Sequence, residues 1–163
     1  GTATLTILLK QTCAEAEVNG LDGDLKVLAL ARTKIETAGL DIGLTQGLAW
    51  EAPFPPASFD RIVSSLVFHH LTTEEKRRTL KRVRELLKRG GEVHIADWGK
   101  AQSPVMRVAF LAIQLLDGFA TTTDNVRGFL PTFMAEAGFR AVEETHREMT
   151  VFGTLSLYRG FAP

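Results

Sequence analysis

The sequence predicts an α/β fold, a three-layer sandwich with helices on both faces of a mostly parallel sheet. Helical and strand-like segments alternate along the chain, which is the pattern of strand–helix–strand units. A continuous apolar run over residues 61–68 is typical of a strand buried on both faces. The 163 residues contain no internal repeat and suffice to bury a core, so we expect one domain over 1–163.

The first third of the chain predicts two helices and two strands. A helix begins within 5–10, and a short strand then runs to Asp22. The segment 24–39 has apolar residues at helical spacing, with Gly39 where a terminal glycine is expected. A further strand is expected over 42–47.

The clearest helix lies within 71–91. Thr72 and Glu75 have the spacing of a capping box, and the pair Gly90-Gly91 is expected to end the helix. A strand over 92–97 follows. The inner stripe of the helix consists of Leu80, Val83, Leu86 and Leu87.

The last third of the chain predicts a cap helix over about 104–119, a linker over 121–129 and a short helix over 130–139. Two closing strands, 140–151 and 153–163, are expected to pair antiparallel. The cap segment is shorter than the roughly 18 apolar residues that span a membrane, and charged and polar residues interrupt it. It could wall an apolar substrate pocket or pack against a second subunit.

Charge and cysteine content give no indication of a nucleic-acid or membrane partner and exclude an internal disulfide. The counts of Lys+Arg and of Asp+Glu are both 19, so net charge points to neither a nucleic-acid nor a membrane partner. The basic residues of 76–89 are interpreted as the solvated face of a helix. The single Cys13 excludes an internal disulfide and suits a reducing cytoplasm, where we expect the protein to reside. The histidines and Cys13 lack zinc-ligand spacing, so no metal site is expected.

Several polar residues stand where a parallel sheet exposes its ligand crevice, at the carboxyl ends of strands. Asp22 ends one strand and could accept hydrogen bonds from ribose hydroxyls. The helix before that strand opens with the turn Gly1-Thr2, where an anionic group could bind. His69 and His70 follow another strand, and either could remove a proton or simply cap and pack. Asp97 could bind a substrate or serve as a turn residue.

The segment 46–71 resembles the class I S-adenosylmethionine-dependent methyltransferases, specifically the small-molecule branch similar to ubiquinone- and menaquinone-biosynthesis enzymes. The resemblance continues to the end of the chain. The matching residues are Gly47, Ala49, Pro53-Phe54, Ser58-Phe59-Asp60, Ser64-Ser65 and His69-His70.

The resemblance implies a Rossmann-like fold, S-adenosylmethionine as cofactor and a small-molecule substrate. It implies His69 or Asp97 as catalytic base, with His70 and Trp98 facing the substrate. The cofactor-binding residues that it implies are Gly1, Thr2, Asp22, Gly23, Leu48, Ala49 and Ser65.

The chain also departs from the family pattern. The family's first strand is missing, Ala3 replaces the last loop glycine, and Leu48 replaces an acid near the adenine. Three explanations are open: the sequence is part of a longer protein, the strands ending at Asp22 and Phe68 pair directly, or a second copy supplies the pairing surface. Of these we expect the N-terminally truncated, rearranged sheet with direct pairing. A homodimer, swapped or intertwined, would help to bury exposed apolar surface. The alternative function is a non-catalytic binding or interaction module that has lost part of its cofactor loop.

Overall fold

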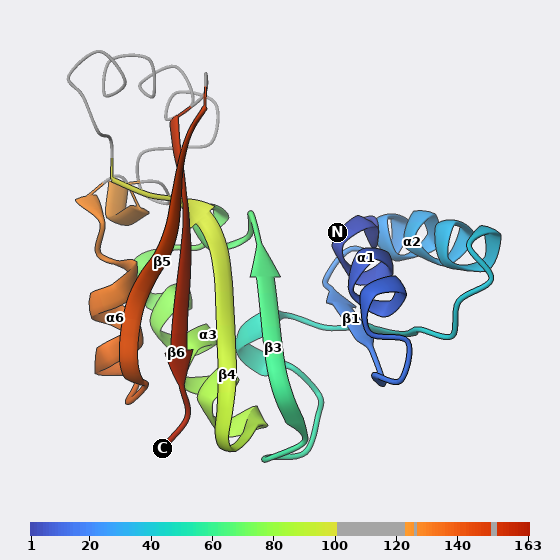
Figure 1. The fold of residues 1–163 in the computed structure, drawn as a ribbon, viewed down its shortest axis with the longest axis horizontal. Coiled ribbons are helices and arrows are strands. Elements are labelled where there is room, and N and C mark those ends of the chain that lie inside the picture. Colours follow the sequence, from blue (N-terminus) through green and yellow to red (C-terminus); the bar gives the residue numbers. More distant parts are fainter. Residues whose placement is uncertain (101–122, 126, 151–152) are drawn as a thin grey trace. The chain divides into compact units, whose positions relative to one another are not determined.

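A computed structural model describes residues 1–100, 123–125, 127–150 and 153–163, and these residues form two compact units (Figure 1). Unit 1 spans Gly1–Pro53 and unit 2 spans Phe54–Pro163. The described strands form two sheets, one of two strands in unit 1 and one of four strands in unit 2. Each unit is described by itself, and the single domain over 1–163 stays a prediction.

Unit 1 contains a parallel strand pair and two α-helices, all close to their predicted positions. Strands β1 and β2 pair in parallel, with Asp22 opposite Gln46 at their carboxyl ends. The elements are α1 (Thr4–Thr12), β1 (Asn19–Asp22), α2 (Leu25–Thr37), β2 (Gly43–Gln46) and the 3₁₀ turn η1 (Ala49–Glu51).

Local chemistry sets the ends of α2. The Asp24 side chain accepts a hydrogen bond from the Lys26 amide at 2.7 Å and caps the helix N-terminus. Gly39 has a φ of 64°, the left-handed conformation expected after a helix end. The small core of the unit is formed by Ala3, Ala31 and Ile35, with Ile7, Ile42 and Leu44 packed against it.

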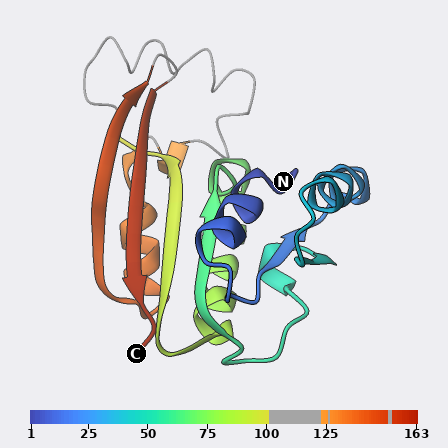
Figure 2. The same ribbon diagram turned by 45° about the vertical axis from the view of Figure 1, so that its right-hand side comes forward.

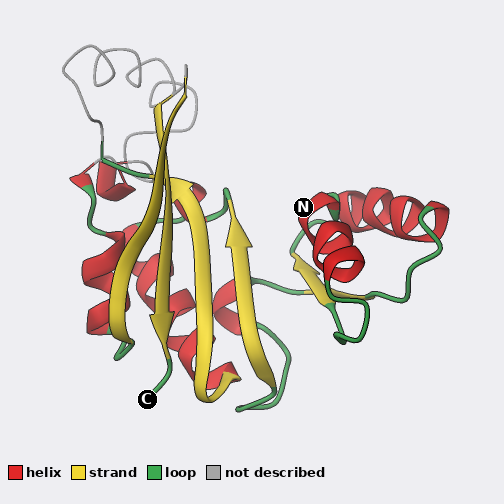
Figure 3. Cartoon of the chain, viewed as in Figure 1, coloured by secondary structure: helices red, strands yellow, loops and turns green. Residues whose placement is uncertain are grey.

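Unit 2 is a four-stranded sheet in the order β3-β4-β6-β5, and α3 and α6 cover the same face of it (Figures 1 and 2). Figure 3 shows the same view with the helices in red and the strands in yellow. The predicted antiparallel closing hairpin is confirmed as β5 and β6, with β6 also antiparallel to β4. The elements are β3 (Phe59–Ser65), η2 (Phe68–His70), α3 (Thr73–Leu86), β4 (Leu87–Trp98), α6 (Leu130–Glu136), β5 (Arg140–Thr150) and β6 (Gly153–Phe161).

The core of unit 2 lies between the sheet and its two helices. Leu80, Val83 and Leu87 of the predicted stripe belong to this core, with Leu80 at 0% exposure, although Leu87 is the first residue of β4. Each fully buried leucine of this kind contributes about 1.5–3 kcal/mol relative to an exposed one. The other apolar residues of the cluster include Val93, Ile95, Leu130, Phe133, Met134, Phe139 and Tyr158.

The start of α3 is as predicted, but its end is not. Thr72 and Glu75 form a complete capping box. The helix ends at Leu86 instead of at Gly90-Gly91 because β4 starts at Leu87. The glycines instead lie where the register between β3 and β4 shifts, since Phe59 pairs with Leu87 and Arg61 pairs with Glu92. Gly90 adopts a φ of 75° there, which favours glycine.

Two expectations about β3 are wrong. The strand ends at Ser65, and it is not buried on both faces, since 39% of Val63 is exposed. Among the described strands β3 pairs with β4 alone and β1 pairs with β2, so the expected pairing of β3 with the strand ending at Asp22 is not found there. Within the described residues β3 is a terminal strand of its sheet, which accounts for its exposure.

The predicted cap helix over 104–119 lies outside the described residues. The linker predicted over 121–129 is helical at residues 123–125, which corrects that prediction. Among the helices that the structure describes, none has the length and apolarity needed to cross a membrane.

Candidate cofactor and substrate site

Asp22 ends β1 at the edge where the two parallel strands of unit 1 finish. Its Oδ1 accepts a hydrogen bond from the Asp24 amide at 2.9 Å, and its Oδ2 accepts one from the Gly1 amino group. Partial burial raises the pKa of the Asp22 carboxyl, whereas hydrogen bonds from the Asp24 and Gly23 amides lower it. Asp22 is therefore an ionised acceptor at neutral pH, suited to hydroxyl donors.

Gly23 and Leu48 lie beside Asp22. The amide of Gly47 donates to the Asp22 carbonyl at 3.0 Å, which brings the chain after β2 back to the end of β1. A Cβ on Gly23 would lie 3.2 Å from Leu48 Cδ2, so the glycine allows a close approach. Leu48 is 45% exposed and leads directly into η1, which starts at Ala49. These predicted cofactor residues are thus neighbours in unit 1.

Gly1 and Thr2 precede α1, and a basic side chain joins them. Lys34 Nζ of α2 donates to Thr2 Oγ1 at 3.0 Å. Ala3 is buried and has a φ of 64°, so it occupies the left-handed conformation that a glycine would adopt more easily. Sequence reasoning missed Lys34, because nothing in a helical pattern shows which residue of α2 reaches the start of α1.

In unit 2, Ser65 ends β3 and is exposed, and the chain then folds over the end of β4. Leu66 turns the chain with a φ of 55°, and its amide donates to the Ala96 carbonyl at 2.8 Å. The next two amides, of Val67 and Phe68, both donate to Asp97 Oδ2, at 3.0 and 2.7 Å. Asp97 therefore anchors the loop that carries both histidines.

His69 is bonded to the other oxygen of the same carboxylate. His69 Nδ1 lies 2.9 Å from Asp97 Oδ1, and the two residues are 5% and 0% exposed. A carboxylate only accepts, so Nδ1 donates to Asp97, and the neutral form of the ring has its lone pair on Nε2. Among the described residues, Nε2 makes no hydrogen bond.

The aromatic neighbours of His69 are the two residues predicted to face the substrate. The ring of His70 lies 3.9 Å from that of His69, between centroids, and the ring of Trp98 lies 6.3 Å away. His70 is exposed and Trp98 is half-buried. Unit 2 therefore brings together all four of His69, His70, Asp97 and Trp98.

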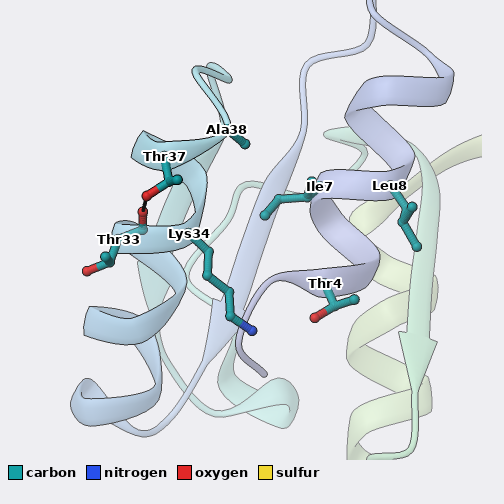
Figure 4. Close-up of a pocket in the computed structure, with 7 residues that line it drawn as sticks. All are labelled: Thr4, Ile7, Leu8, Thr33, Lys34, Thr37 and Ala38. Atoms are coloured by element: carbon teal, nitrogen blue, oxygen red, sulfur yellow. Dashed lines mark hydrogen bonds between the residues drawn. The ribbon is translucent and has the colours of Figure 1, made fainter.

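A groove of about 400 Å³ lies between α1 and α2 in unit 1 (Figure 4). Figure 4 shows Ile7 and Lys34 pointing into the space between the two helices. The lining includes none of the predicted site residues, but it includes Lys34, which donates to Thr2. Within the described ranges, no group of three or more His, Cys, Asp or Glu side chains could hold a metal ion.

Comparison with known proteins supplies the chemical context. The methyltransferase domain family matches residues 1–91. The chain is 28% identical, over 181 aligned residues, to the demethylmenaquinone methyltransferase of Thermus thermophilus, covering 100% of this chain and 80% of the relative.

Two solved structures have the same fold at low identity. One is the S-adenosylmethionine-dependent methyltransferase SibL in its apo form, with a TM-score of 0.73 and 20% identity, covering 100% of this chain and 48% of that one. The other is PigF with SAH (S-adenosylhomocysteine), with a TM-score of 0.76 and 15% identity, covering 100% of this chain and 48% of that one. The predicted Rossmann-like methyltransferase fold is thereby confirmed, and the chain spans about half the length of these two proteins.

Proposed function

Because the chain belongs to the methyltransferase domain family, we propose that it transfers a methyl group from S-adenosylmethionine to a small molecule. The observation that carries the proposal is the pairing of His69 Nδ1 with the buried Asp97 carboxylate at 2.9 Å. This pairing leaves a basic ring nitrogen beside two aromatic side chains. The relative with a named substrate makes demethylmenaquinone the first acceptor to test.

The residues of unit 1 fit the cofactor chemically. Asp22 is ionised and would accept hydrogen bonds from the ribose hydroxyls, with Gly23 leaving room beside it. Leu48 and Ala49 would pack on the adenine. When bound, S-adenosylmethionine supplies a methyl group on a positively charged sulfur, and the electrons of the broken S–C bond remain on that sulfur.

The start of α1 would hold the amino-acid end of the cofactor. Free amides at a helix N-terminus attract anions, and Lys34 adds a positive charge there through its contact with Thr2. Gly1 and Thr2 would lie against the methionine part, whereas the role of Ser65 beside the sulfonium stays a prediction from the family resemblance. Lys34 is thus a candidate partner for the cofactor carboxylate.

His69 acts as the general base and Asp97 as its positioning residue. Nε2 would accept the proton that the acceptor loses as its nucleophilic atom takes the methyl group, and Asp97 would stabilise the charge that develops on the ring. Asp97 does not itself touch the substrate, because it is fully buried and its oxygens are occupied. His70 and Trp98 would orient an aromatic acceptor.

Transfer of a labelled methyl group to a short-chain demethylmenaquinone analogue, kept in its hydroquinone form by a chemical reductant in the assay, tests this proposal. His69→Gln should lower the rate by about 10²–10⁴-fold, as expected for loss of a general base. His146→Gln is the matched control, because that histidine is exposed and far along the chain on β5. Full activity of H69Q would exclude the assigned base.

We also propose a homodimer and a cytoplasmic location. The terminal strand β3 presents backbone groups on one edge, and such an edge is a template for pairing with another chain. Cys13 is an exposed free thiol, which suits a reducing compartment. Light scattering after size exclusion should give twice the mass of one chain, whereas the mass of a single chain would contradict the dimer.

A further inference from the structure

The buried Asn125 contacts the carboxylate that holds His69. Asn125 lies in the helical segment 123–125 and is 1% exposed. Its Nδ2 donates to Asp97 Oδ1 at 3.1 Å and to the Trp98 carbonyl at 3.2 Å. An amide from a distant part of the chain therefore bonds to the end of β4 at the residue paired with the histidine.

The hydrogen bonds of Asp97 divide between its two oxygens. Oδ2 accepts only from the backbone of the loop after β3. Oδ1 accepts from His69 Nδ1, from the Trp98 amide at 2.8 Å and from Asn125. Apart from His69, Asn125 is the only side chain that donates to this carboxylate in the described part of the chain.

We infer that Asn125 is a positioning residue, which fixes the Asp97 carboxylate so that His69 keeps its proton on Nδ1 and its lone pair on Nε2. The inference rests on the proposed function only in calling His69 the base. The geometry of the three side chains stands without it.

The chemistry of the amide supports this role. Asp97 can only accept, so the NH₂ group of Asn125 must face it. Its Oδ1 is then buried with no hydrogen-bond partner in the described structure. Leaving the Oδ1 acceptor buried and unpaired costs free energy. We infer that the hydrogen bonds donated by the NH₂ group offset this cost. An aspartate here would place a second carboxylate beside the first.

The neighbouring residue provides a matched control. Asp124 Oδ2 accepts from Thr73 Oγ1 at 2.6 Å and from the buried Lys76 Nζ at 3.3 Å, which ties the same helical segment to α3. Thr73→Val removes the first of these bonds without touching Asp97. This variant weakens the attachment of the segment 123–125 to α3 while the contact between Asn125 and Asp97 remains, so the two effects can be told apart.

Nitrogen NMR of the histidine rings in the whole chain tests the inference without cofactor or substrate. The His69 signals are identified by their loss in H69Q. In the unchanged chain they should show the Nδ1–H tautomer. In Asn125→Leu and in Asn125→Asp the Nδ1 and Nε2 signals should move toward those of a mixture of tautomers, whereas T73V should match the unchanged chain.

Unaltered His69 signals in both folded Asn125 variants, or the same change in T73V, would overturn the inference. If neither variant folds, hydrogen exchange of the side-chain amide protons of Asn125 is measured in the unchanged chain. The inference predicts that these protons are protected, and rapid exchange would contradict it. Methyl transfer is a separate readout. A chain that shows the expected His69 response without any transfer refutes the proposed function alone.

Discussion

At the scale of single residues, short-range chemistry was predictable and long-range contacts were not. The capping box of Thr72 and Glu75 follows from a spacing of three residues. The pairing of His69 with Asp97 joins residues 28 positions apart, and Asn125 lies another 28 positions along. Sequence reasoning proposed both His69 and Asp97 without knowing that they touch, and it did not consider Asn125. A lone asparagine in a polar segment has no pattern that would reveal such a contact.

Glu75 makes a pH-dependent contribution to stability. Hydrogen bonds from the Thr72 amide and hydroxyl lower the pKa of the Glu75 carboxyl below its ordinary 4.5. A group with a lowered folded-state pKa stabilises the fold above its unfolded pKa, and the effect is lost as pH falls through the folded value. Glu75→Gln should therefore be less stable than the unchanged chain at neutral pH, with the difference shrinking below pH 4.5.

Urea unfolding at a series of pH values between about 3 and 7 measures this difference. Glu74→Gln is the control, because Glu74 is also in the first turn of α3 but takes no part in the capping box. A difference between E75Q and the unchanged chain that stays constant across the series would contradict the predicted linkage.

At the scale of elements, helix and strand existence followed from periodicity, and the boundaries depended on pairing. The positions of α1, α2, α3, α6 and the closing hairpin agree with the patterns that predicted them. The predicted end of α3 is wrong because Gly90 lies at a shift in the register between β3 and β4. That shift depends on the pairing with β3, which the local sequence does not reveal. The exposure of β3 likewise depends on its place in the sheet, since an apolar run reads the same at the centre or the edge.

Gly99, directly after β4, is predicted to tolerate no side chain. A Cβ there would overlap Ser156 Oγ and lie 2.8 Å from Ser156 Cβ. Because both residues are buried, Gly99→Ala should lower the free energy of unfolding by about 1–3 kcal/mol. The double variant Gly99→Ala with Ser156→Gly should recover part of that loss, measured by urea unfolding. Purely additive effects of the two changes would contradict the clash.

At the scale of the whole molecule, composition and alternation of elements predicted the fold class, and the methyltransferase fold of the relatives agrees with it. The division of the described strands into two sheets was not predicted. Among the described strands β1 pairs only with β2 and β3 only with β4, so the expected direct pairing is not found there. Sequence patterns give the faces of strands but carry little information on which strand lies beside which.

The single domain over 1–163 predicts cooperative unfolding. Leu80→Ala creates a cavity in the core of unit 2, and Ile35→Ala does so in the core of unit 1; each should cost about 2–5 kcal/mol. If the chain unfolds as one domain, both variants lower the midpoint of one shared calorimetric transition. Two transitions, each shifted by only one of the variants, would contradict the prediction.

The central claim, that this chain binds S-adenosylmethionine through Asp22, is tested most directly by isothermal titration with S-adenosylhomocysteine. The unchanged chain and the Asp41→Asn control, an exposed acid of the same unit, should bind equally. Asp22→Asn should bind about 10–100-fold more weakly, as expected for the loss of hydrogen bonds to a charged acceptor worth about 1.5–3 kcal/mol. Absence of binding by the unchanged chain at millimolar ligand, or equal binding by D22N, would contradict the claim.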